Sequence, residues 1–184
     1  MSKRTFISQF FKRGNKVGAI APSSRFLAAK MLHHVPFESC KTIVEFGPGT
    51  GAFTKLIQTK MQADAKLLII ELNEAFCSEL RDKFENDSTE VIHGSATELK
   101  KILAERNLSE ADCIISSLPL AIFNETLRNN ILSEAHNSLK IGGYFIQFQY
   151  SLQSKKALQK HFSQLKVDFT PLNIPPAFIY TCKK

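Results

Sequence analysis

Short runs of apolar residues alternate along this chain with stretches in which apolar residues recur every three or four positions. A short β-branched or aliphatic run is typical of a buried strand, and the longer periodicity is typical of a helix with one buried face. Because strands and helices alternate, we expect an α/β fold with a mostly parallel sheet. The predicted strands lie within residues 42–46, 65–71, 90–96, 112–116, 144–150, 166–170 and 177–181.

Helices are predicted between these strands, and the last two strands are predicted to form a closing pair around Asn173-Ile174-Pro175-Pro176. A turn is predicted at residues 139–143, where two glycines precede a strand. The predicted helices are residues 2–13, a helix that starts near Ser23 or Ser24, residues from about 50 to 60, a helix that opens after Asn73, and residues 121–138 and 155–165.

The bulk composition indicates one ordinary globular domain. A length of 184 residues with 43% hydrophobic and 22% charged residues is enough for a substantial core. No apolar run approaches the 18 residues of a membrane span, and we expect no secretory signal. The four cysteines are far apart and form no C-x-x-C pair, so we expect reduced thiols, no zinc or other metal site, and a cytoplasmic protein.

The net charge of +7 comes from the N-terminal segment. Basic and acidic residues balance from residue 38 onward, whereas residues 1–37 contain no acid. Such an asymmetry favours a polyanionic partner, either nucleic acid or an anionic membrane surface, although a solvated basic arm would have the same composition. The basic residues of the segment are Lys3, Arg4, Lys12, Arg13, Lys16, Arg25 and Lys30.

Residues 2–13 combine this charge with an apolar stripe. Phe6, Ile7, Phe10 and Phe11 fall on one face of a helix. An aromatic face flanked by cations suits a helix that lies in the plane of a membrane surface, and the same face would also suit packing on a protein domain. We therefore expect residues 1–37 to form a basic amphipathic extension that packs on the domain of residues 38–184.

The glycines at 47, 49 and 51 mark the most informative stretch, residues 42–54. A strand, a tight glycine turn and a helix form the geometry in which a backbone presses against a nucleotide-like ligand. The turn lacks the Lys-Ser/Thr pair of a triphosphate-binding loop, and its G-x-G-x-G spacing differs from the G-x-G-x-x-G of dinucleotide folds. Glu45 at the strand end would repel a pyrophosphate, so the turn favours a cationic ligand.

Val44-Glu45-Phe46-Gly47-Pro48-Gly49-Thr50-Gly51 resembles the first motif of class I S-adenosylmethionine (SAM)-dependent methyltransferases. SAM carries an ammonium and a sulfonium and no phosphate. The resemblance implies a Rossmann-like fold with a seven-stranded, mostly parallel sheet, an antiparallel last strand, helices on both faces and an N-terminal helical extension. Four segments together resemble the bacterial phospholipid N-methyltransferases: Val17 to Ser24, Ser117 to Leu120, Phe148-Gln149-Tyr150 and Asn173 to Ala177.

The resemblance also implies which residues contact SAM. Glu71 ends the second strand, where an acid accepts both ribose hydroxyls of an adenosine. Family members usually carry an Asp at the position of Ser95, whose hydroxyl would accept from the adenine amine without a charge. The segment before the first motif closes over the methionine end of SAM. The implied SAM-binding residues are Glu45, Gly47, Gly49, Thr50, Gly51, Glu71, Leu72, Gly94, Ser95, Ala96, Ser116, Pro22 and Ser23.

The loop after the fourth strand indicates the class of substrate. Ribosomal RNA adenine dimethyltransferases, which are more distantly similar, carry an Asn and an aromatic residue here, and the ring stacks on the base. Ser117-Leu118-Pro119-Leu120 lacks both, so the loop favours a non-aromatic amine. The resemblance implies methylation of the headgroup amine of phosphatidylethanolamine or a related aminolipid by a peripherally membrane-associated enzyme. An rRNA adenine or a small-molecule acceptor remains the alternative.

Candidate catalytic residues are Ser117, Leu118 and Pro119 of this loop and Tyr150 at the end of the fifth strand. An alkylammonium must lose a proton before it can accept a methyl group. Tyr150 is a candidate for holding or deprotonating the amine, because its ring could also face a cation. It is equally compatible with a role in the core. His136 and Glu125 are further candidate bases.

Deleting residues 1–13 should weaken binding to anionic vesicles by about a hundredfold or more, because four basic residues near such a surface each contribute about 1 kcal/mol. Vesicle sedimentation with anionic lipid measures this effect, and neutral vesicles are the control. Unchanged binding of the truncated protein to anionic vesicles would show that the segment is not a membrane helix.

Overall fold

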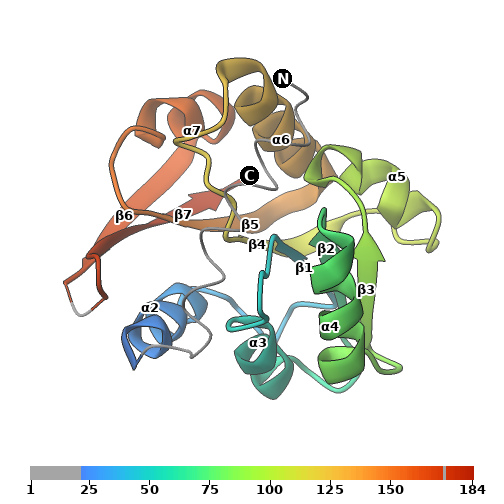
Figure 1. Ribbon diagram of the computed structural model, residues 1–184. Coiled ribbons are helices and arrows are strands. Elements are labelled where there is room, and N and C mark those ends of the chain that lie inside the picture. Colours follow the sequence, from blue (N-terminus) through green and yellow to red (C-terminus); the bar gives the residue numbers. More distant parts are fainter. Residues whose placement is uncertain (1–21, 172) are drawn as a thin grey trace.

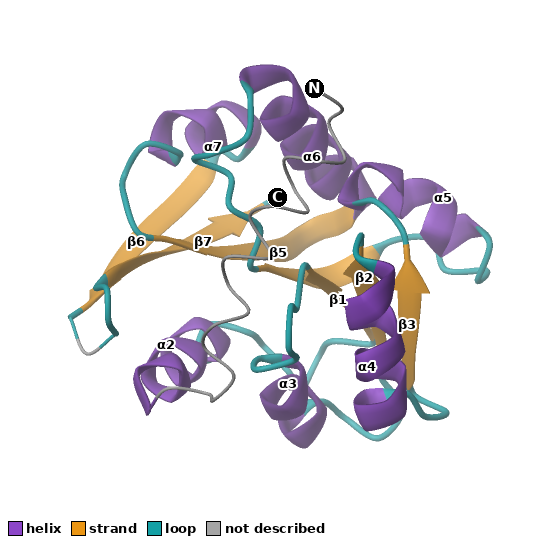
Figure 2. Ribbon diagram, in the orientation of Figure 1, coloured by secondary structure: helices purple, strands orange, loops and turns teal. Residues whose placement is uncertain are grey.

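The computed structural model describes residues 22–171 and 173–184, and for residues 22–25 it describes the backbone alone. Helices and strands alternate through this part of the chain and form layers on either side of one sheet (Figures 1 and 2). The elements are α2 (Pro22–Leu32), β1 (Thr42–Phe46), α3 (Thr54–Lys60), β2 (Lys66–Glu71), α4 (Glu74–Phe84), β3 (Thr89–His93), the 3-10 helix η1 (Ala96–Glu98), α5 (Leu99–Ala104), β4 (Ala111–Ser116), α6 (Glu125–Ser138), β5 (Leu139–Gln149), α7 (Lys155–His161), β6 (Gln164–Thr170) and β7 (Ala177–Lys183).

The sheet has seven strands in the order β3-β2-β1-β4-β5-β7-β6. The first five strands of this order pair in parallel, and β7 runs antiparallel to both β5 and β6. The predicted seven-stranded, mostly parallel sheet with an antiparallel last strand is therefore confirmed. Helices α2, α3 and α4 cover one face, and α5, α6 and α7 cover the other (Figure 2).

Two apolar cores lie on the two faces of the sheet. Successive side chains of a strand point to opposite faces, so β1 places Ile43 in one core and Val44 and Phe46 in the other. In β2, Leu67 and Leu68 divide in the same way. Every residue of β1 is buried, because the strand is central and covered on both sides. This burial explains why the inner strands are continuous apolar runs in the sequence.

The first core also holds the described part of the predicted N-terminal extension. Leu27, Ala28, Met31 and Leu32 of α2 are buried there. The predicted helix of residues 2–13 lies outside the described residues. No helix within residues 22–171 and 173–184 is long and apolar enough to cross a membrane.

Four predicted boundaries are wrong where backbone geometry or tertiary pairing determines the structure. The helix expected from about residue 50 begins at Thr54, because the glycine turn takes the preceding residues. The helix expected at 121–138 begins at Glu125, where the side chain of Asn124 accepts a hydrogen bond from the backbone N–H of Leu127.

The remaining two errors lie in β5 and α7. The turn expected at 139–143 belongs to β5, which pairs with β4 across a register shift and contains Gly142 at a φ of 80°. The helix expected at 155–165 ends at His161, because Gln164 and Leu165 pair with β7 instead. Cross-strand hydrogen bonds thus override the local helical pattern.

Asp112 near the start of β4 links three segments at the end of the sheet where the parallel strands begin. Its Oδ2 accepts hydrogen bonds from the backbone N–H groups of Lys41 and Thr42, each at 2.7 Å, and its carboxylate pairs with the ammonium of Lys140. Burial alone would raise the pKa of Asp112, but these hydrogen bonds outweigh it and lower that pKa below its usual value. The ionised carboxylate therefore stabilises the folded chain.

Asp112→Ala should lower the free energy of unfolding by about 2–4 kcal/mol, because two backbone donors and an ammonium lose their acceptor. Urea denaturation at pH 7 measures this loss. Since the folded-state pKa is depressed, the stabilisation is complete above the unfolded pKa of about 4 and disappears as the pH falls through the folded value. The difference between the two proteins should therefore shrink in acid.

Asp64→Ala is the matched control, because Asp64 pairs with Lys41 on the surface. Its denaturation midpoint should stay at that of the unsubstituted protein. Equal effects of the two substitutions would contradict the anchoring role of Asp112.

Candidate functional site

The candidate site lies at the carboxyl ends of β1, β2 and β4. Strand β1 is the point at which the chain order of the sheet reverses, since β2 follows it on one side and β4 on the other. In open α/β sheets ligands bind at this position, because the loops after the two strands diverge to opposite faces. The glycine turn after β1, the residues after β2 and β3 and the loop after β4 meet here.

Each glycine of the turn has a positive φ, which L side chains rarely adopt. A Cβ at Gly47 would lie 2.7 Å from the side chain of Leu118, and one at Gly51 would lie 2.2 Å from the ring of Phe84. Close packing thus excludes a side chain at both positions. A Cβ at Gly49 would meet nothing within 4 Å, so this is the position where the turn leaves open space for a ligand.

Glu45 is a fully buried carboxyl group next to this turn. Its Oε2 accepts a hydrogen bond from the hydroxyl of Thr54 at 2.7 Å, whereas Oε1 has no partner among the described residues. Burial and, less strongly, the negative charge of Glu71 raise the pKa of Glu45 to about 8, although the hydrogen bond from Thr54 opposes the shift. A cation bound nearby would stabilise the ionised form of Glu45.

Glu71 at the end of β2 is the second buried carboxyl group. Its Oε1 accepts from the backbone N–H of Asn73 at 2.9 Å, and its Oε2 has no partner within the described part of the chain. Burial raises the pKa of Glu71, although hydrogen bonds from the backbone of Asn73, Gly49 and Leu72 oppose the shift. The free oxygen can accept from the hydroxyls of a ribose.

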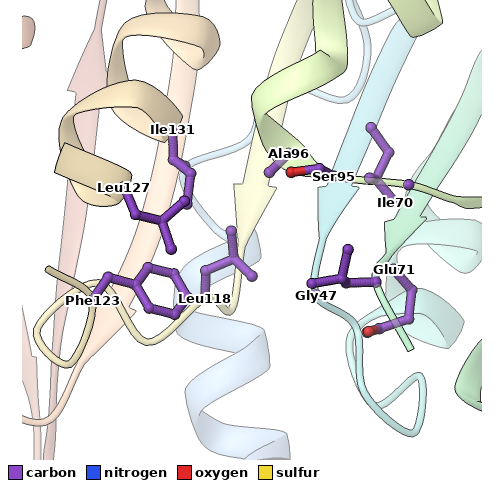
Figure 3. Close-up of a pocket in the computed structure, with 11 residues that line it drawn as sticks. Gly47, Ile70, Glu71, Ser95, Ala96, Leu118, Phe123, Leu127 and Ile131 are labelled. Atoms are coloured by element: carbon purple, nitrogen blue, oxygen red, sulfur yellow. The ribbon is translucent and has the colours of Figure 1, made fainter. Parts of the chain in front are cut away.

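A cleft with about 450 Å³ of empty space, which includes open solvent, lies beside these groups (Figure 3). One wall contains Gly47, Glu71 and Ser95, and the facing wall is apolar (Figure 3). Seven residues that the sequence indicates as SAM-binding or catalytic line it: Gly47, Glu71, Leu72, Gly94, Ser95, Ala96 and Leu118.

The sequence reasoning missed the apolar residues of the cleft. Ile70 lines the same wall as Glu71, while Phe123, Leu127 and Ile131 form the facing wall (Figure 3). The last three are spaced by four residues on and just before α6, which is a signal for one helix face. Local periodicity alone could not show that this face borders a cleft. An apolar wall opposite polar groups suits a flat adenine ring.

The side chain of Ser95 is partly used in capping the short helix η1. Its hydroxyl accepts from the backbone N–H of Thr97 at 3.3 Å and lies 2.8 Å from the Thr97 hydroxyl, while Glu98 closes the capping box. A hydroxyl has two acceptor lone pairs and one donor, so Ser95 retains limited capacity for an adenine contact.

Other predicted SAM-binding residues lie outside the cleft lining. The hydroxyl of Ser116 is buried and accepts from the backbone N–H of Leu118 at 3.3 Å, which stabilises the loop. Thr50 is exposed in the glycine turn. Pro22 and Ser23 begin α2, and their side chains are outside the described part of the structure.

A second cavity, with about 1090 Å³ of empty space that includes open solvent, borders the loop after β4. Leu118 lines both cavities, so the loop separates the cleft from this second space. The predicted catalytic residues Ser117, Leu118, Pro119 and Tyr150 all line it. The complete lining is Ser117, Leu118, Pro119, Ala121, Ile122, Phe148, Gln149, Tyr150, Ser151 and Gln153.

Two buried glutamines of β5 hold this loop, and the sequence reasoning did not assign either a role. The carboxamide nitrogens of Gln147 and Gln149 both donate to the backbone carbonyl of Leu118, at 3.0 and 2.9 Å. The carboxamide oxygen of Gln149 also accepts from the backbone N–H of Ala121 at 3.2 Å. The backbone N–H of Leu120 donates to the same carbonyl at 2.8 Å. Because a carbonyl oxygen has two lone pairs, the Leu118 carbonyl is fully occupied and cannot also accept from the substrate amine.

Ser117 lines the second cavity, and its hydroxyl oxygen is buried with no hydrogen-bond partner among the described residues. Tyr150 is about half exposed there, and its ring meets Phe148 edge to face at 5.6 Å. Partial burial raises the pKa of Tyr150, and a hydrogen bond with Asn173 opposes the shift. Tyr150 is therefore a neutral phenol in this cavity, and this argues against a role as a phenolate base.

The other two candidate bases line neither cavity. His136 packs edge to face against Phe162 at 5.5 Å, and Glu125 is exposed in the first turn of α6. No group of three His, Cys, Asp or Glu side chains in residues 22–171 and 173–184 is arranged to hold a metal. The donor set of Glu45, Glu71 and the glycine turn instead fits a cationic adenosyl compound such as SAM.

Glu45→Gln should weaken SAM binding by roughly ten- to a hundredfold, because an amide cannot supply the charge that a buried cation requires. Isothermal calorimetry measures the affinity. Since the pKa of Glu45 is about 8 without ligand, binding should release a proton below that pH, and affinity should rise with pH up to about 8. The variant should lack this component, so any pH dependence it retains belongs to the ligand or to Glu71.

Glu79→Gln is the control for this measurement, because Glu79 pairs with Lys83 on the surface of α4. Its affinity for SAM should equal that of the unsubstituted protein. An unchanged affinity in Glu45→Gln would show that Glu45 does not face the cation.

Comparisons with known proteins identify the family of this chain. Residues 43–143 match the family model described as a methyltransferase domain. The chain is 30% identical over 180 residues to the ornithine lipid N-methyltransferase of Singulisphaera acidiphila, which covers 97% of this chain and 94% of that protein. It is 26% identical over 138 residues to ribosomal RNA small subunit methyltransferase A of Mycoplasma mycoides, covering 74% of this chain and 47% of that protein.

Solved structures of methyltransferases share the fold. The N-methyltransferase NodS from Bradyrhizobium japonicum, in complex with S-adenosylhomocysteine, superimposes with a TM-score of 0.73 at 11% identity, covering 96% of this chain and 97% of that one. The 1,6-didemethyltoxoflavin-N1-methyltransferase of Burkholderia thailandensis gives a TM-score of 0.74 at 14% identity, covering 98% and 86%. With the family match and the 30% identical relative, these findings show that the chain belongs to the class I SAM-dependent methyltransferases.

Proposed function

We propose that this methyltransferase N-methylates the headgroup amine of an aminolipid, with ornithine lipid as the first candidate and phosphatidylethanolamine as the second. The observation that carries the proposal is the second cavity, which meets the cofactor cleft at Leu118 and is lined largely by aliphatic and aromatic side chains. The relation to an ornithine lipid N-methyltransferase over nearly the full length of both chains supports this substrate class.

The cofactor would be held through Glu71, which lines the cleft, and Glu45, which is buried next to the glycine turn. Glu45 and Glu71 each present an oxygen with no partner among the described residues, toward a cation and toward ribose hydroxyls respectively. When bound, SAM supplies a methyl group already activated by the sulfonium, so the protein mainly contributes alignment. The glutamines that fix the Leu118 carbonyl keep the loop between the cavities in one position.

The second cavity would hold the amine in its reactive, neutral form. An alkylammonium has a pKa near 10.4, and transfer into apolar surroundings lowers it. The free hydroxyl oxygen of Ser117 can accept a hydrogen bond from the amine, and the ring of Tyr150 can face the cation before it loses its proton. The cavity thus favours an amine without requiring a charged base.

An adenine of ribosomal RNA is the alternative that the relation to rRNA methyltransferase A raises. The loop argues against it, because the family position for a stacking ring holds Leu120, and that side chain is buried in the core. We therefore assign the membrane surface, rather than RNA, as the partner of the predicted basic segment at residues 1–13.

A methyl-transfer assay with radiolabelled SAM tests the proposal. Ornithine lipid, phosphatidylethanolamine and ribosomal RNA are offered separately to the full chain. Label should enter the lipid amine, with ornithine lipid the better substrate, and Glu71→Gln should lower transfer by about tenfold or more because its ribose contact is lost. Label in RNA and in neither lipid would overturn the aminolipid assignment.

A further inference from the structure

Three loops at the carboxyl-end edge of the sheet expose large apolar side chains. Ile122 in the loop after β4 is 46% exposed, Leu152 in the loop after β5 is 48% exposed, and Ile174 in the loop between β6 and β7 is 85% exposed. Tyr150 adds a half-exposed ring. Single exposed apolar residues are ordinary, but a group from separate loops marks an interaction surface.

These side chains belong to one rim around the second cavity. Ile122 and Tyr150 line the cavity, and Leu152 lies between the lining residues Ser151 and Gln153. Tyr150 hydrogen-bonds to Asn173, the neighbour of Ile174, which brings the loop between β6 and β7 to the same edge. Strand pairing also brings these loops to one edge, because Gln149 at the end of β5 lies opposite Phe178 near the start of β7.

The loops that carry the rim are uncharged, with Glu125 following the first loop and lysines following the second. Residues 117–124, 150–154 and 171–176 contain no charged side chain. Helix α7 follows directly with the exposed residues Lys155, Lys156 and Lys160, and residues 150–161 contain no acid. An apolar rim bordered by cations matches the headgroup boundary of an anionic bilayer.

We propose that this rim, Ile122, Tyr150, Leu152 and Ile174, docks on an anionic lipid bilayer. The inference rests on the proposed function, because only a lipid substrate requires the cavity mouth to face the membrane. With the rim inserted at the headgroup boundary and the lysines of α7 against anionic lipid, an aminolipid headgroup enters the second cavity while its acyl chains stay in the bilayer. The rim contains none of residues 2–13, which are predicted to form the N-terminal helix.

Tryptophan fluorescence tests the docking directly, because the sequence contains no tryptophan. Ile174→Trp in the full chain introduces a single reporter at the rim. With vesicles of phosphatidylglycerol that carry brominated acyl chains, its emission should shift to shorter wavelength and lose about half or more of its intensity, since bromine quenches only nearby rings. Ile141→Trp is the matched control, because Ile141 is 89% exposed near the opposite end of β5.

Equal emission shifts and equal quenching of the tryptophans at positions 174 and 141 would overturn the proposal that the rim docks on the bilayer. Strong quenching at 174 with little at 141 would support it. Circular dichroism of both variants before the experiment shows that each is folded.

The second measurement compares the methylation rate on vesicles with the rate on a soluble substrate. The double variant Leu152→Ser, Ile174→Ser should methylate aminolipid in vesicles about tenfold or more slowly, because two inserted side chains become polar. With a soluble short-chain aminolipid its rate should equal that of the unsubstituted protein, since neither residue lines the cavity. Ile141→Ser should retain full activity on both substrates.

Full activity of the double variant on vesicles would overturn the docking face. Failure of the unsubstituted protein to methylate any aminolipid would overturn the proposed function instead. In that event, selective quenching at position 174 would still support membrane contact by the rim, so the two failures can be told apart.

Discussion

Glu45 is the buried carboxyl group around which this site is arranged. Its strand is central in the sheet and covered on both faces, so its carboxyl group has no access to water. Thr54 satisfies one oxygen, and the other has no partner among the described residues. A buried unpaired carboxylate is costly unless it is protonated or meets a cation. The nearby Glu71 reinforces this constraint, and together the two acids exclude phosphates and favour a cationic adenosyl ligand.

The loop after β4 borders both the cofactor cleft and the cavity proposed for the substrate. Leu118 packs against the position where Gly47 lacks a side chain, and it also lines the second cavity. Gln147 and Gln149 occupy its carbonyl, which leaves the hydroxyl of Ser117 as the free acceptor beside it. A loop fixed by buried glutamines and tipped with aliphatic groups can position an amine without a stacking platform. The loop that borders the cofactor cleft therefore also lines the cavity proposed for the methyl acceptor.

The positions of the site residues were predictable where each residue follows the end of a strand, while their roles stay predictions. Glu45, Glu71 and the residues after β3 follow short apolar runs, so their position at the carboxyl edge of a parallel sheet is implied by the alternation of strands and helices. The helix and strand boundaries near residues 139–143 and 155–165 were predicted wrongly. There, pairing with β4 and β7 decides the conformation, and such pairing leaves no local periodicity.

By itself the sequence determined the order of strands and helices, the ligand's charge and the absence of an aromatic residue in the Ser117 to Leu120 loop, because each depends on neighbouring residues. Only the tertiary structure decided that glutamines 29 and 31 residues away hold the Leu118 carbonyl. It also decided that Phe123, Leu127 and Ile131 face a cleft, and that the side chains of Ile122, Leu152 and Ile174 are exposed. These relations join residues far apart in the chain, and chain folding alone brings them together.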